Sequence, residues 1–396
     1  MSTQFTSTVK PSGGDYTSLN NAVTGLANDI TAADIKVFSI SASTTPTIAA
    51  GDTVLGQSSG ATGVCVLVNA TKTQILIKTI AVASFLYGEI VQKTAVPATN
   101  VTLSNTGDSP IIGIECYSML DTTIVSNIGL YTTSSTNYLY IYTPKSERHN
   151  GKWDDTKYRL ETTWAGIYIS TDYARIEGLQ IKITRDGDNG NAIHVNNQNI
   201  NNDIRISNCI IKAVITGGTY HAGIYIENSN AIVKLWNNII YDWKYQGLDP
   251  YNNAIECAYA NTVYAYNNTV YNNDAGFVSI VATTVLKNNL SYNNTKNYTG
   301  IFDEVNSTNN LSGPQQINSP GVNPRQNQTV IFVSELDDDF HLSPSDTGAR
   351  NYGVADPGIG LFSDDIDGQM RPNTMWDIGA DQASSCPSIG IQFTVI

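Results

Sequence analysis

Basic residues are scarce in this chain. Its 22 Lys and Arg residues are outnumbered by 35 Asp and Glu residues, so the formal net charge at pH 7 is -13 and the pI is about 4.6. Nucleic acid and anionic membrane surfaces attract proteins through positive charge. The composition therefore argues against nucleic acid as a partner and favours a neutral or cationic one.

Long apolar runs are also missing. No stretch approaches the roughly 18 residues needed to cross a bilayer, and no basic segment followed by an apolar run opens the chain. We therefore expect neither membrane insertion nor an export signal.

Cysteines are few, and their number is odd. They are widely spaced and show neither a CxxC pair nor a Cys/His metal pattern, so we predict buried free thiols and no metal or other cofactor. The five are Cys65, Cys116, Cys209, Cys257 and Cys386.

Short strands repeat every 21 to 31 residues through the second half of the chain. Apolar residues alternate with polar or aromatic ones in each strand, which is the period of a β-strand and not of a helix. Isoleucine or phenylalanine at the second position of each strand is expected to point inward and stack into an apolar ladder. These inward residues are Ile167, Ile193, Ile224, Ile255 and Phe277.

A second register runs in step with the strands. It places glycine or asparagine where the chain must turn, and we interpret this series as a structural ladder of stacked side chains. Its members are Gly178, Asn208, Asn237, Asn267, Asn288 and Asn309.

Coils of this length, with Gly, Asn and Asp turns, resemble the right-handed parallel β-helix of pectate lyases and phage tailspikes. The resemblance covers residues 109–312 and implies an all-β solenoid. It does not fix an activity, because that scaffold carries lyases, hydrolases, adhesins and inert virion parts.

The flanking segments complete a four-part organisation. Residues 1–36 are predicted to form an N-terminal cap, since Leu19, Ala22, Val23, Leu26 and Ile30 have helical spacing behind a Ser or Thr cap. Residues 37–108 lack the repeat and are predicted to form a small inserted β domain. Within it, Ser59-Gly60-Ala61-Thr62-Gly63 followed by Gly88-Glu89-Ile90-Val91 resembles a small β module of phage structural proteins. Residues 313–396 are similar to closing segments that wrap the last coils of bacterial surface β-helix proteins.

One outward column is the candidate binding site. The strand alignment places Tyr168, His194, Tyr225 and Glu256 on the same face, about 4.8 Å apart per coil. Aromatic rings beside polar groups are suited to sugars, because sugar C–H faces stack on rings while hydroxyls need polar partners. We therefore predict a carbohydrate-binding groove, although outward Tyr and His are also common on plain β-surfaces.

No catalytic residues are singled out. The carboxylates in the turns include Asp186, Asp188, Asp249 and Asp274, but the sequence selects no pair among them for glycoside hydrolysis. The loop 147–155 and the Asp365–Gly368 turn are further candidate sites, although the turn lacks the remaining ligands of a calcium loop.

A basic stripe is the last candidate. Arg175, Arg205 and Lys234 align in the second register, where they either bind an acidic glycan or pair with acidic neighbours.

Three functions are compatible with these patterns. The first is a structural protein on the virion surface of a tailed phage, as a capsid decoration, head fibre or tailspike, which assembles as a homotrimer and with other virion proteins and binds polysaccharide. The second is a polysaccharide depolymerase of the lyase or glycoside hydrolase type. The third is a bacterial surface adhesin, which would be extracellular or on the cell surface.

Overall fold

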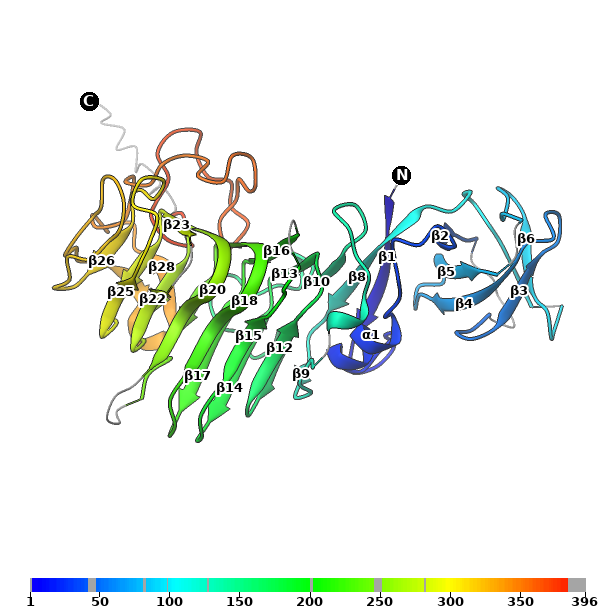
Figure 1. Ribbon diagram of the computed structural model, residues 1–396, viewed down its shortest axis with the longest axis horizontal. Helices are drawn as coiled ribbons and strands as arrows, with labels where there is room; N and C mark the ends of the chain where they lie inside the picture. Colours follow the sequence, from blue (N-terminus) through cyan, green and yellow to red (C-terminus); the bar gives the residue numbers. More distant parts are fainter. Residues whose placement is uncertain are drawn as a thin grey trace, which may run out of the picture.

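Parallel strands stacked in coils form most of the protein. We describe it in a computed structural model, which describes residues 2–41, 48–80, 83–97, 99–126, 128–199, 202–245, 251–280 and 283–383. The coils stack along the long axis of the molecule, with a small separate sheet beyond the first coil (Figure 1). The predicted all-β parallel β-helix is confirmed.

A 12-stranded parallel sheet forms two of the faces of the solenoid. Within it, β18 pairs with β15 near Ile224 and with β16 near Lys234, so one long strand passes from the first face to the second. The first face is built from β12 (Ala165–Ile169), β15 (Asn191–Val195), β18 (His221–Trp236), β20 (Asn252–Tyr266), β22 (Ala275–Ser279) and β25 (Lys296–Gly300). The second is built from β1 (Ser2–Val9), β8 (Ser109–Cys116), β10 (Leu139–Tyr142), β13 (Ala174–Glu177), β16 (Asp203–Ser207), the later parts of β18 and β20, and β23 (Thr283–Lys287).

An eight-stranded parallel sheet forms the third face. Its strands are β9 (Leu120–Asp121), β11 (Arg159–Thr162), β14 (Gln180–Arg185), β17 (Ile210–Ile215), β19 (Ile239–Tyr241), β21 (Thr269–Tyr271), β24 (Leu290–Tyr292) and β26 (Leu311–Gly313). A short 3-10 helix, η1 (Ile128–Leu130), lies between β9 and β10 in the chain.

The predicted apolar ladder fills the interior. Ile193, Ile224, Ile255 and Phe277 are successive partners in register, and none is more than 2% exposed. Complete burial of such a side chain contributes about 1.5–3 kcal/mol, so the ladder is a principal source of stability.

The cysteines that the structure describes are buried, as predicted. Cys65, Cys116, Cys209 and Cys257 are buried and unpaired, whereas Cys386 lies outside the described residues.

The asparagine series has two neighbouring parts with different roles. The predicted turn positions, from Asn208 to Asn309, adopt a left-handed backbone with φ of 51–58°, which asparagine tolerates better than most residues. The residue after each of the turns from Asn237 onward forms a second ladder, in which the fully buried amides hydrogen-bond from coil to coil. Its members are Asn238, Asn268, Asn289 and Asn310. The sequence analysis identified the first series and missed the second.

The N-terminal end of the solenoid carries a helix and a separate sheet. Helix α1 (Leu19–Gly25) starts at Ser18, whose side chain accepts a hydrogen bond from the Asn21 backbone, and it buries Leu19, Ala22 and Val23. The separate sheet is antiparallel and has its own apolar core. Its strands, in spatial order, are β2 (Ile35–Ser39), β5 (Gln74–Thr79), β4 (Thr62–Val68), β3 (Thr53–Gly56), β6 (Ile90–Lys93) and β7 (Asn100–Thr102).

A side-chain amide covers the outer edge of β1. Gln74 accepts a hydrogen bond from the Thr6 backbone at 3.0 Å and donates one to the Gln4 carbonyl at 2.8 Å. Unpaired strand edges invite association with other chains. The inserted sheet therefore protects the first strand, in addition to the helix that the sequence predicted as the cap.

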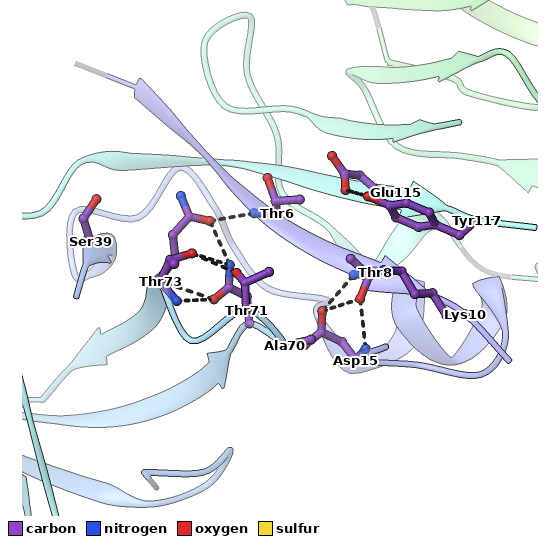
Figure 2. A pocket seen from close by; sticks show the side chains of 12 residues that line it. Thr6, Thr8, Lys10, Asp15, Ser39, Ala70, Thr71, Thr73, Glu115 and Tyr117 are labelled. Atoms are coloured by element: carbon purple, nitrogen blue, oxygen red, sulfur yellow. Dashed lines mark hydrogen bonds between the residues drawn. The ribbon is translucent and has the colours of Figure 1, made fainter. Parts of the chain in front are cut away.

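A polar cavity of about 510 Å³ lies beside this contact (Figure 2). Its walls include Thr8, which hydrogen-bonds to Asp15, and Tyr117, over whose ring Lys10 lies at 3.9 Å. These polar side chains interact with one another. Residues of both the inserted sheet and the solenoid line the cavity, so it lies at the contact between the two.

The C-terminal segment packs along the later coils after the repeat ends. It contains β27 (Phe332–Ser334), the 3-10 helix η2 (Glu335–Asp337) and β28 (Asp339–Leu342). The left-handed asparagines hold it, because their side-chain amides donate to its backbone carbonyls, as Asn267 does to Asp377 and Gly379 at 3.0 Å each. In the described part of the chain, no helix is long and apolar enough to span a membrane.

Candidate carbohydrate-binding site

The strand register brings the four predicted site residues together. Tyr168 on β12 is opposite His194 on β15, His194 is opposite Tyr225 on β18, and Tyr225 is opposite Glu256 on β20. Their neighbours along each strand point inward, so all four side chains face outward and are partly exposed. The predicted column is confirmed as an arrangement, and its role in binding stays a prediction.

The rings of the column touch one another. The centroids of Tyr168 and His194 are 4.9 Å apart with planes at 86°, and those of His194 and Tyr225 are 5.1 Å apart at 40°. Edge-to-face contacts of this kind are favourable for aromatic pairs. Three successive coils thus present one continuous aromatic surface.

Glu227 orders the polar groups of this surface. Its Oε1 lies 2.9 Å from Nε2 of His194, and its Oε2 accepts a hydrogen bond from the Tyr225 hydroxyl at 3.0 Å. Burial lowers the pKa of His194 and outweighs the opposing effect of Glu227, so the imidazole is neutral at pH 7. The column is therefore a mixture of neutral rings and carboxylates.

A cavity of about 490 Å³ continues the column beyond Glu256. Tyr220 and Tyr251 stand at its wall with parallel rings, 5.6 Å between centroids and 4° between planes. They are 60% and 55% exposed, respectively. Parallel exposed rings offer apolar faces and edges to a sugar ring.

Two carboxyl groups share this cavity. Glu256 accepts a hydrogen bond from Asn253 at 2.7 Å, and Asp274 accepts one from Asn252 at 2.7 Å. Burial raises the pKa of both carboxyl groups. Groups of this kind accept hydrogen bonds from sugar hydroxyls when ionised and donate one when protonated.

Sequence reasoning missed the two tyrosines of the cavity. Tyr220 directly precedes β18 and Tyr251 directly precedes β20, and the two are 31 residues apart, like Tyr225 and Glu256, so the repeat contained the signal. Asp274 was one of several acidic turn residues, and only the structure separates it from Asp186 and Asp188, which are not in the cavity wall. Asp249 lies outside the described residues.

The loop 147–155 and the Asp365–Gly368 turn meet in the structure. Gly151 lies so close to His341 and Asp367 that a Cβ atom would clash with both. Nδ1 of His341 is 2.5 Å from Asp339, and its Nε2 is 3.1 Å from Asp367. The two sequence candidates thus form one contact between an early loop and the C-terminal segment.

A histidine and two carboxylates in this contact have metal-ligand spacing. His341, Asp367 and Asp381 offer ligand atoms within 4.8 Å of one another. Burial alone would lower the pKa of His341, but its hydrogen bonds and ion pairs with Asp367 and Asp339 raise it to about 10. The imidazole and the carboxylates of Asp339 and Asp367 form a charge network that connects the strand β28 to the Asp365–Gly368 turn.

Comparisons with known proteins add little to this geometry. No protein-family model matches the chain. No curated protein matches it either. A solved structure of the pectate lyase Pel9A is similar at 13% sequence identity, with a TM-score of 0.29, over 69% of this chain and 88% of that one. The fold assignment therefore rests on the strand pairing of the chain itself.

Proposed function

We propose that this protein is a structural, surface-exposed protein of a tailed-phage particle that binds a glycan along the column and its terminal cavity. One observation supports the proposed glycan binding. The aromatic column continues into a 490 Å³ cavity whose wall includes two exposed tyrosines with parallel rings. A parallel β-helix repeats its side chains at ~4.8 Å per coil, which suits a linear polymer.

The charge of the site indicates the kind of glycan. Glu227, Glu256 and Asp274 are acidic, whereas Lys296 is the basic residue in the cavity wall. Like charges repel most strongly in partly desolvated sites. A neutral glycan or an amino sugar therefore fits the column better than a polyuronate does.

Replacing Tyr220 and Tyr251 with Ala together tests this proposal. We expect the double variant to lose binding to a neutral cell-envelope polysaccharide, measured by calorimetry, because ring stacking supplies the apolar contact area. Tyr87 lies in the turn before β6, away from the cavity, and is 72% exposed, so Tyr87→Ala is a control for the loss of an exposed ring. Unchanged binding by the double variant would overturn the proposal.

The virion assignment has a separate test. Mass spectrometry and immunogold labelling of purified particles should find the protein on the particle surface, assembled as a homotrimer. Detection on the bacterial surface, and not on particles, would support the adhesin alternative with the same glycan site.

Depolymerisation is the second candidate function, favoured by the two carboxyl groups in one cavity. A glycosidase uses one carboxyl group as the acid and a second as base or nucleophile. Glu256→Gln should then abolish the appearance of new reducing ends while glycan binding survives. A wild-type protein that binds the glycan and releases no reducing ends would exclude this candidate.

A further inference from the structure

A row of cations crosses the second face of the solenoid. Arg175 on β13 is opposite Arg205 on β16, and Arg205 is opposite Lys234 on β18. The row continues at both ends with tyrosine, since Tyr140 pairs with Arg175 and Tyr264 pairs with Lys234. The stripe that the sequence indicated is therefore a continuous column on a different face from the candidate glycan site.

The positive charge of this row is only partly compensated. Asp203 forms ion pairs with two of the cations. Its Oδ2 lies 2.5 Å from Arg205, and its Oδ1 lies 3.0 Å from Lys234. The guanidinium of Arg175 lies over the ring of Tyr138, 3.4 Å from its centroid. Among the residues that the structure describes, no group accepts a hydrogen bond from Arg175.

This arrangement is unfavourable for the sheet by itself. Like charges directly opposite each other on neighbouring strands are destabilising. One carboxylate for three cations leaves an excess of two positive charges, in a protein whose net charge is -13. An anion bound along the row would offset the repulsion among the three cations that the single charge of Asp203 does not neutralise.

The chemistry of the row selects a particular anion. A guanidinium binds a carboxylate through two parallel N–H donors, and an Arg side chain provides this geometry where Lys does not. Neighbouring strands are ~4.8 Å apart, a spacing similar to the length of one pyranose unit. The tyrosines at the two ends of the row, Tyr140 and Tyr264, are partly exposed.

We propose that the column formed by Arg175, Arg205 and Lys234 is a second binding site, which takes an acidic polysaccharide with about one carboxylate per coil. The site is independent of the acidic column on the first face. The two faces then bind glycans of opposite preference.

Calorimetry with alginate oligosaccharides tests the site, with carboxyl-reduced alginate as the neutral counterpart. We expect alginate to bind and the reduced form not to bind. Arg175→Gln should weaken alginate binding about tenfold, and Lys234→Gln should weaken it similarly. Arg175→Gln should not lower the melting temperature, because it removes a like charge that forms no ion pair with Asp203, whereas Lys234→Gln also removes the ion pair with Asp203 and should lower it slightly.

Control variants distinguish binding at this row from general attraction of an anion to positive charge. Arg185→Gln makes the same charge change on the third face and should leave alginate binding unchanged, as should the Tyr220 and Tyr251 double variant. Equal binding of the reduced form, or equal losses with Arg185→Gln and Arg175→Gln, would overturn the proposal. Polyphosphate that binds as tightly as alginate would show that only charge is recognised, which would also overturn it.

Discussion

Removing the amide of Asn268 tests whether the second asparagine ladder stabilises the solenoid. Asn268 is fully buried, and its Oδ1 accepts hydrogen bonds from the backbone N–H and from Nδ2 of Asn238, at 3.1 and 2.9 Å. Its own Nδ2 donates to Oδ1 of Asn289 at 3.0 Å and to the Leu235 carbonyl at 3.1 Å. One side chain thus connects three coils.

The expected cost follows from these contacts. In Asn268→Ala, the buried backbone N–H of Asn238 loses its acceptor, and the Nδ2 hydrogen bonds disappear. An unsatisfied buried donor costs about 1–3 kcal/mol and each lost hydrogen bond about 1 kcal/mol, so we expect a loss of about 3–5 kcal/mol.

Urea unfolding and hydrogen exchange measure this loss. Because a solenoid opens locally, exchange should accelerate first in β18, β20 and β21 around the substitution. Asn267→Gly is the comparison variant, since glycine tolerates the φ of 51°. It removes the hydrogen bonds to the C-terminal segment and the one that Nδ2 of Asn288 donates to Oδ1 of Asn267. A change below about 1 kcal/mol for Asn268→Ala, or equal exchange patterns for both variants, would refute the ladder as described.

Three further predictions concern the core, the edge and pH. Ile224→Asp should prevent folding, because it places a charge in a fully buried apolar ladder, whereas Tyr225→Ala on the outward side should fold normally; protease resistance distinguishes the two. Gln74→Leu should expose the edge of β1 and increase self-association in light scattering, and a variant that associates no more than wild type would contradict the edge role. Burial raises the pKa of Asp365 to about 6 and that of Asp381 to about 7. The folded state therefore holds these protons more tightly than the unfolded state does, and the stability they contribute is fully present below about pH 4 and lost as the pH rises through 7. Urea midpoints measured from pH 4 to 8 should show this fall, and Asp381→Asn should reduce it.

The coil register was predictable because it depends on the alternation within each strand and on the spacing between successive strands. Alternation determines which side chains point inward, and the 31-residue spacing from Ile224 to Ile255 identifies their partners from the amino-acid order alone. The column from Tyr168 to Glu256 follows from the same register, so its arrangement could be predicted as well.

Other features depend on long-range contacts that leave little local signal. Strand β1 pairs with β8 across the whole inserted sheet, and the alternation in Ser2–Val9 does not identify that partner. The 490 Å³ cavity depends on the positions of the rings of Tyr220 and Tyr251 relative to Asp274 and Lys296, which the strand spacing does not determine. The members of the two asparagine series are adjacent in sequence, and only the structure separates the left-handed turn residues that bind the C-terminal segment from the buried residues of the second ladder.

The C-terminal segment decides which parts of the second face are open to a ligand. Its Phe362 stacks on Trp236 with 5.9 Å between ring centroids and packs against Trp376 at 5.3 Å, so Trp236, two residues after Lys234 on β18, is already covered. Arg205 and Lys234 stay partly exposed beside this cover. Deleting the segment would therefore create new aromatic surface and confuse any binding assay. Point substitutions within the row avoid this problem, because they leave the hydrogen bonds from the left-handed asparagines to the segment intact.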